Sequence, residues 1–152
     1  MKLPIPESWN TVQLGKGYTI SFPATASSKT GEDRSVFALD TDEIIYTCEV
    51  RDMSDDAGFQ KMKAEKLHKV FEQMADAFGS AYRRDIQTID VRKNDTGQTA
   101  YITYSGANNT KALAKIISQG DLLYTAFTSI YIPATDELVN NANVFIGSLD
   151  KE

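Results

Sequence analysis

The chain has 152 residues, which is close to the usual size of a single domain. Its 16 lysine and arginine residues and 21 aspartate and glutamate residues give a formal net charge of −5, and its pI is near 4.9. This acidic balance argues against nucleic acid or an anionic membrane as the main partner. One cysteine and one histidine exclude an internal disulfide framework, a CxxC redox centre and zinc sites built on several cysteines or histidines.

The composition predicts one domain over residues 1–152, with an ordered core at about 9–149, because 41% of the residues are apolar and 24% are charged. The opening MKLPIPESW lacks the apolar segment of a signal peptide. Two alternatives remain open, a cytoplasmic protein and an exported protein whose signal has been removed. The longest uncharged stretch, residues 122–135, has 14 residues and is too short to cross a bilayer as a helix.

The first elements in chain order are predicted to be strands. Residues 9–14 and 18–22 form a strand pair across the turn Gly15-Lys16-Gly17, since apolar and polar residues alternate in YTISF. Residues 24–33 are small and polar, and we expect a loop there. Residues 35–39 and 44–51 then predict a hairpin around an acidic turn.

A long amphipathic helix is predicted over about residues 56–78, with Ser54, Asp55 or Asp56 as N-cap and Gly79 as the residue that ends it. At about 100° per residue, six apolar side chains fall on one stripe and are expected to be buried. They are Phe59, Leu67, Val70, Phe71, Met74 and Phe78. Replacing such a leucine by alanine is expected to cost about 2–5 kcal/mol.

Strand patterns return after the helix, at about residues 82–93, 98–105, 111–118 and 122–131. The turns between them (94–97, 106–109 and 119–121) are short, so neighbouring strands must be antiparallel. The last of these strands is apolar on both faces, which predicts a central strand covered on both sides. A second helix is predicted after Pro133. Its buried stripe is Leu138, Ala142, Phe145, Ile146 and Leu149.

This order of elements predicts the α+β class, an α/β/α sandwich in which an antiparallel sheet of about six to seven strands is flanked by two main helices.

No motif indicates a catalytic, cofactor-binding or metal site. Ile20 stands where a dinucleotide-binding fingerprint has its third glycine, and a strand follows instead of a helix. The acidic turn at 40–43 opens like a calcium loop, but the twelfth position is Arg51 instead of a glutamate. We therefore expect a solvated hairpin turn there.

The chemically reactive side chains have structural interpretations. His68 falls at the edge of the helix's polar stripe and is expected to be exposed instead of acting as a base. Cys48 alternates with Tyr46 and Val50, which predicts a buried, unreactive thiol.

Two groups on the strands leave alternatives open. The tyrosines of the strands form either a ligand-stacking platform or part of the core, and we favour the core because half-buried strands prefer tyrosine. They are Tyr101, Tyr104, Tyr124 and Tyr131. The pairs Arg83-Arg84 and Arg92-Lys93 form either a basic spot on one strand or an ordinary solvated edge, which we favour.

Three segments resemble the PsbP/DcrB/Mog superfamily: GYTISFP near the start, the mid-chain amphipathic helix, and SQGDLLYTAFTSIYIP leading to NNANVFIGSL. In that superfamily an opening FSI-FP strand and a closing strand with an FL-SF helix recur at these positions. Here Ile146-Gly147-Ser148-Leu149 stands where Leu-x-Ser-Phe is commoner. The resemblance covers about the full chain and implies the same sandwich, but it carries no catalytic signature.

Members of that superfamily look like non-enzymatic binding domains: photosystem II extrinsic subunits, periplasmic or lipid-anchored bacterial proteins, and Ran-binding Mog proteins. The resemblance therefore implies a protein-binding or scaffolding module of the bacterial envelope, without a cofactor, whose precursor would carry a signal or lipobox before Met1. The string LPIPESW is similar to the LPESW opening of Eag-type chaperones, which implies a cytoplasmic, dimerising chaperone of secreted effectors as the alternative. A hydrolase with scattered catalytic residues is the second alternative, and a homodimer stays open.

Overall fold

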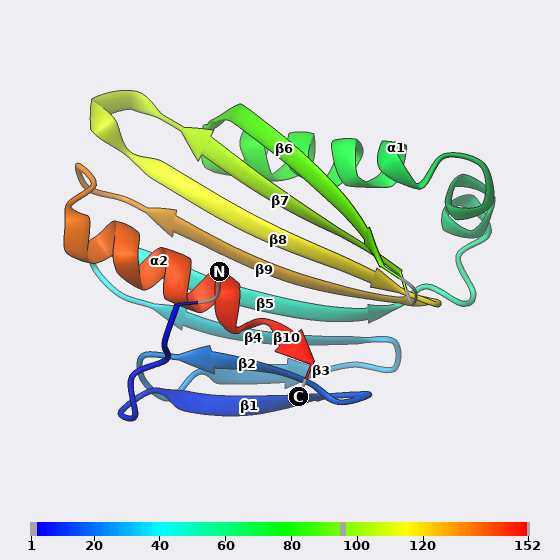
Figure 1. Cartoon of the computed structure of the whole chain (residues 1–152), viewed down its shortest axis with the longest axis horizontal. Helices are drawn as coiled ribbons and strands as arrows, with labels where there is room; N and C mark the ends of the chain where they lie inside the picture. The colour runs from blue at the N-terminus through cyan, green and yellow to red at the C-terminus, as the bar shows by residue number, and fades with distance from the viewer. Residues whose placement is uncertain (1–2, 95–96, 152) are drawn as a thin grey trace.

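A computed structural model of the chain describes residues 3–94 and 97–151, apart from the side chains of 64–66 and 94 (Figure 1). Two residues of the predicted turn 94–97, at 95 and 96, thus lie outside the described residues. The two long helices lie on opposite sides of a large antiparallel sheet, and a small sheet lies on the same side as the second helix (Figure 1). The predicted α+β class is confirmed.

Within the described residues, the main sheet has seven strands in the order β3-β4-β5-β9-β8-β7-β6, and all neighbours are antiparallel. Its strands are β3 (Ser27–Thr30), β4 (Arg34–Asp40), β5 (Ile44–Asp52), β6 (Asp85–Asn94), β7 (Gly97–Ser105), β8 (Lys111–Gln119) and β9 (Leu122–Ile130). A single turn of 3-10 helix (Ala107–Asn109) joins β7 to β8. All residues of β9 after its first are buried, so the prediction of a central strand covered on both faces is confirmed.

A separate three-stranded sheet was not predicted. It consists of β1 (Asn10–Gly15), β2 (Tyr18–Phe22) and β10 (Asp150–Lys151), in the order β1-β2-β10. The predicted β1–β2 pair is present, and Gly15, Lys16 and Gly17 turn the chain with φ of 91°, 56° and 84°. The β1–β2 pair lies outside the main sheet. All five residues of β2 are buried and β2 packs against the second helix, while the two-residue β10 pairs with the edge of β2 that β1 leaves free. Two residues carry no detectable periodicity.

The prediction of a loop over residues 24–33 is wrong for its central residues. Residues 27–30 form β3, which pairs with β4 from Ser27 opposite Ala38 to Thr30 opposite Ser35. All four residues of β3 are exposed, so backbone hydrogen bonds at the sheet edge hold the strand. Side-chain alternation cannot reveal a strand of this kind.

Helix α1 (Ala57–Tyr82) begins as predicted but ends later. Asp56 is the N-cap, and its Oδ1 accepts a hydrogen bond from the Phe59 amide at 2.9 Å. Gly79 lies inside the helix, and Arg83, with φ of 55°, ends it. The prediction that Gly79 follows the helix is therefore wrong. The close approach of another backbone segment favours glycine at this position, because a Cβ there would lie 2.9 Å from the Arg84 carbonyl oxygen.

The apolar stripe of α1 is buried only in part. Phe59, Val70 and Phe71 are buried, but Leu67, Met74 and Phe78 are half-buried, which corrects the expectation for these three side chains. A helix of 26 residues is about 39 Å long, whereas a nine-residue strand spans about 30 Å. Since the sheet also twists, a straight stripe cannot face it along the whole helix.

Helix α2 (Asp136–Ser148) begins at the N-cap Thr135, whose hydroxyl accepts from the Leu138 amide at 3.2 Å. It packs against β8 and β9 of the main sheet and against β2. The five residues of its predicted stripe are all buried, and Ser148 is buried as well. The Ser148 hydroxyl accepts from the Ser21 amide at 2.9 Å, which ties the end of α2 to β2.

The main sheet therefore separates two cores. On one face, α1 packs against β7, β8 and β9 through residues such as Ala100, Ile116 and Phe127. On the other face, α2 and β2 pack against β5 and β9 through residues such as Tyr46 and Phe145. Figure 1 shows α2 lying over β9 and β5, on the side of the main sheet opposite to α1.

Candidate interaction surface

Cys48 lies in the core between the main sheet and α2, as predicted. Its side chain is fully buried, opposite Ala126 of β9. Burial, with a smaller effect of the neighbouring Glu49 carboxylate, raises the pKa of the thiol to about 12. The thiolate required for nucleophilic chemistry is therefore strongly disfavoured at neutral pH.

Thiol labelling of the folded protein is expected to be slow. Because Cys48 is enclosed and its thiolate is disfavoured, a reagent such as 5,5′-dithiobis(2-nitrobenzoic acid) should react only through opening of the core. Addition of denaturant should then accelerate the reaction to the rate of an unstructured cysteine. Rapid labelling under native conditions would contradict this placement.

His68 is exposed on α1, as predicted. It lies on the helix that covers one face of the main sheet, whereas Cys48 faces the opposite core. The structure therefore does not bring the two side chains together.

The acidic turn between β4 and β5 is a solvated hairpin turn, as expected. Thr41 organises it, because its hydroxyl oxygen accepts from the Ile44 amide at 3.0 Å and from the Glu43 amide at 3.3 Å. Asp42 and Glu43 are exposed. Within residues 3–94 and 97–151, no group of three or more histidine, cysteine, aspartate or glutamate residues could hold a metal ion.

The four strand tyrosines do not form a platform. Tyr104 and Tyr124 are buried in different cores, and their hydroxyls donate to the carbonyls of Ala75 and Gly15 at 3.0 and 3.3 Å. Tyr101 is half-buried and packs on the α2-side core, while Tyr131 is 43% exposed beyond the end of β9. The core interpretation is thus correct for the two buried side chains.

The two basic pairs do not share a strand. Arg83 ends α1, and Arg84 lies in the connection to β6, where its guanidinium donates to the Tyr82 and Ile130 carbonyls at 2.9 and 3.1 Å. Arg92 and Lys93 lie on β6 itself. The alternative of a basic spot on one strand fails because α1 continues through Tyr82 and the strand starts only at Asp85. Arg92 and Lys93 are exposed on an edge strand, as the favoured interpretation expects.

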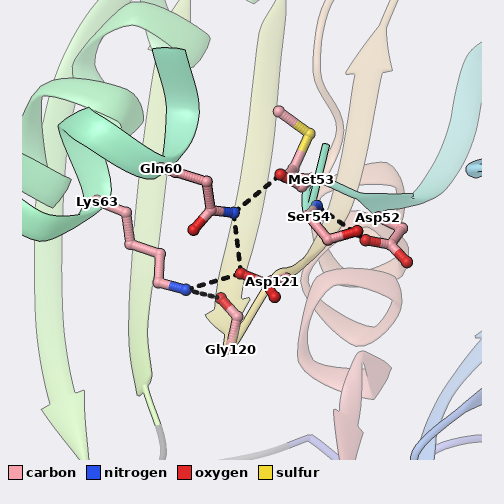
Figure 2. A network of polar contacts seen from close by, with 7 residues as sticks. All are labelled: Asp52, Met53, Ser54, Gln60, Lys63, Gly120 and Asp121. Carbon is pink, nitrogen blue, oxygen red and sulfur yellow. Dashed lines mark hydrogen bonds and ion pairs between the residues drawn. The ribbon is translucent and has the colours of Figure 1, made fainter. Parts of the chain in front are cut away.

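A polar network fixes the first turns of α1 to the turn between β8 and β9 (Figure 2). The Gln60 amide donates to the Met53 carbonyl and to Asp121 Oδ1, both at 2.9 Å. The Lys63 ammonium donates to the Gly120 carbonyl at 2.7 Å and to Asp121 Oδ1 at 3.1 Å. These contacts anchor the start of α1 and give Gln60 and Lys63 a structural role.

Acid is expected to weaken this network. Hydrogen bonds from Gln60 and Lys63 lower the pKa of Asp121 in the folded protein. The carboxylate therefore contributes stability above its unfolded pKa of about 3.9, and that contribution is lost as the pH falls through the lower folded pKa. Asp121→Asn should be less stable than the parent at neutral pH, and the difference in urea midpoint should shrink below about pH 3.

The control for this experiment is Asp42→Asn, which changes an exposed carboxylate in the β4–β5 turn. It should follow the parent protein at every pH. A difference between Asp121→Asn and the parent that grows as the pH falls would contradict the network.

The edge strand β6 is the clearest candidate for an interaction surface. Among the described strands it is the last of the main sheet, has ten residues and pairs with β7 alone. Ile89 and Val91 point to the α1 side of the sheet and are 37% and 36% exposed. The other edge, β3, has only four residues, all exposed and polar. Proteins usually keep long edges from presenting apolar side chains in this way.

The sequence predicts the apolar face of β6 but not its position at the sheet edge. The alternation of Ile89 and Val91 with Asp90 and Arg92 predicts a strand with one apolar face. It does not reveal that this strand is the outermost one, because the order of strands in space depends on the whole topology.

None of the described helices is long and apolar enough to cross a membrane. No protein-family model matches the sequence, and no curated protein matches it either. Among solved structures, the chain is similar to the solution structure of cyanobacterial PsbP (CyanoP) from Synechocystis sp. PCC 6803, with a TM-score of 0.64 and 14% identity. The match covers 95% of this chain and 92% of that chain. The likeness shows that the chain has a PsbP-like fold.

Proposed function

We propose that this protein is a non-catalytic module of the bacterial envelope that binds an extended segment of a protein partner along β6. The observation that carries the proposal is the open ten-residue edge with Ile89 and Val91 exposed. Along an edge strand, alternate residues direct their backbone N–H and C=O groups away from the sheet. An added strand would satisfy these groups through main-chain hydrogen bonds.

The side chains of β6 define the segment that fits. On the α1 side, Ile89 and Val91 favour apolar residues at alternate positions of the partner. On the other side, Asp90 and Arg92 form an ion pair at 3.0 Å and favour polar or charged residues. The expected partner segment is therefore an amphipathic strand.

The placement of the reactive side chains supports a function without catalysis. Cys48 is enclosed with its pKa raised to about 12, and His68 is exposed on the far side of the sheet. A hydrolase would need a nucleophile and a base within hydrogen-bond reach of each other. The alternative of a hydrolase predicts turnover in a broad substrate screen, and turnover abolished by His68→Ala would refute the proposal.

The envelope location rests on the sequence resemblance to exported members of the PsbP/DcrB/Mog superfamily. Expression of the complete natural gene followed by cell fractionation tests it. We expect the protein in the periplasmic or membrane-anchored fraction. Recovery in the cytoplasm would contradict the proposed location and favour the Eag-type alternative.

Site-specific photo-crosslinking tests the partner. A photoreactive amino acid placed at Ile89 or Val91 should give one discrete adduct with another protein in the native cells, and the same group at Lys29 of β3 should give none. The variant Val91→Lys should remove the adduct at position 89 while leaving the unfolding midpoint unchanged, because Val91 is exposed. Adducts that form equally at both edges would overturn the proposal. An adduct of twice the chain mass would overturn the assignment to a different protein and show that the partner is a second copy of this chain.

A further inference from the structure

A cavity of about 220 Å³ opens on the α2 side of the main sheet, lined by β6, β7 and β8 and by β2 and the short strand β10 of the small sheet. Strand register explains how its walls come together. Arg92 pairs with Thr99, and Tyr101 pairs with Lys115, so these four side chains share one face of the sheet. Asp150 of β10 also lines the cavity.

The walls are cationic although the chain as a whole is acidic. Arg92, Lys93 and Lys115 line the cavity together with the Asp150 carboxylate, and Arg92 also pairs with Asp90, while the chain has a net charge of −5. Tyr101 organises two of the cations, since the Arg92 guanidinium lies 5.2 Å and the Lys115 ammonium 5.3 Å from the centre of its ring. Such cation–π contacts stabilise positive charge at the cavity wall.

Lys115 is the most unusual of these residues. It is only 5% exposed, and its ammonium donates a hydrogen bond of 2.5 Å to the Leu149 carbonyl. Lysine is rarely buried to this degree, because its charge loses hydration. Away from bulk water, the field of this fixed charge is screened less than that of a surface lysine.

We propose that this cavity binds a small oxyanion, a carboxylate or phosphate group. The Arg92 guanidinium holds Asp90 Oδ2 through Nε at 3.1 Å and Nη2 at 3.0 Å, so an anion would contact its remaining N–H groups. The Lys115 ammonium adds a buried positive charge from β8, and the Thr99 hydroxyl lies on the same wall. The cavity is smaller than the roughly 300–1,000 Å³ of sites for larger organic ligands, so the anionic group itself sets the fit.

The Asp150 carboxylate opposes the binding of an anion in this cavity. This carboxylate shares the cavity with the three cations, and it adds to the effect of burial, the main cause of the raised pKa of the Tyr101 phenol. It would repel an entering anion and compete for the same cations. Removing this charge must therefore strengthen anion binding, whereas removing Arg92 must weaken it.

The test titrates the full chain with inorganic phosphate and, separately, with acetate, at constant ionic strength, and follows amide resonances by NMR. We expect saturable shifts at Thr99, Tyr101 and Ile117. Arg92→Gln should weaken binding roughly tenfold, because a charge-assisted hydrogen bond is lost. Asp150→Asn should tighten binding several-fold. Saturation by both probes indicates a shared oxyanion site, and saturation by phosphate alone or acetate alone identifies which group it accepts.

Control variants separate a specific site from general charge effects. Lys29→Gln removes an exposed cation from the distant β3 edge and should leave both titrations unchanged. Lys115→Met should abolish binding if it folds, and the exposed Arg92 side chain gives a variant that does not depend on the core. Shifts that grow equally with chloride, or an Asp150→Asn variant that binds no more tightly than the parent, would overturn the proposal.

Discussion

Phe145→Ala is expected to lower the free energy of unfolding by about 3–5 kcal/mol. Phe145 is fully buried in α2, and its ring centre lies 5.1 Å from those of both Phe22 and Tyr46. These contacts join the helix to the small sheet and to the main sheet, so the cavity left by alanine cannot easily collapse. Urea denaturation followed by circular dichroism measures the effect.

The matched control is Asn140→Ala on the exposed side of the same helix, which should change stability by less than about 0.5 kcal/mol. A loss below about 1 kcal/mol for Phe145→Ala would mean that α2 does not pack between the two sheets as described.

Phe71→Ala is expected to have a similar effect on the other core, about 3–5 kcal/mol. Phe71 is fully buried where α1 packs on the main sheet, whereas Leu67, one turn earlier, is half-buried. Leu67→Ala should therefore cost only about 1–2 kcal/mol, since less apolar surface is removed from water on folding. This value revises the larger one expected from the sequence.

The comparison of these two variants uses the same urea titration. Equal losses, or a larger loss for Leu67→Ala than for Phe71→Ala, would show that α1 is rotated about its axis relative to the described packing.

Local periodicity predicted the elements that carry their own burial pattern. Strand β9 was identified as central because both of its faces are apolar, and Cys48 was placed in the core by its register with Tyr46. Both inferences depend only on residues close in sequence. Strand β3 and strand β10 have no such pattern, because the first is held at the sheet edge by backbone pairing and the second is two residues long.

The end of α1 was missed for a related reason. Glycine often ends a helix, but at position 79 it fits for another reason. The Arg84 carbonyl oxygen lies 2.9 Å from the place that a Cβ would occupy. A close approach between two backbone segments is a tertiary feature. The three apolar residues of the stripe that remain half-buried likewise reflect the twist of the sheet beneath the helix.

The candidate surfaces could be predicted even less. The cavity at Lys115 draws its walls from five strands, including β2 near the start of the chain and β10 near its end. The exposed edge depends on β6 being outermost, which follows from the complete strand order. Sequence reasoning favoured an ordinary solvated edge at Arg92 and Lys93, and it had no local signal that these residues meet Tyr101 and Lys115.

Amide hydrogen exchange of β6 tests the central claim most directly. In the free protein, alternate amides of β6 should exchange rapidly, because they point away from β7 at the open edge. In the complex with the partner captured by crosslinking, those amides should become protected, and the amides of β3 at the opposite edge should stay unchanged. Protection that appears over α2 or β3 while β6 continues to exchange rapidly would contradict the account.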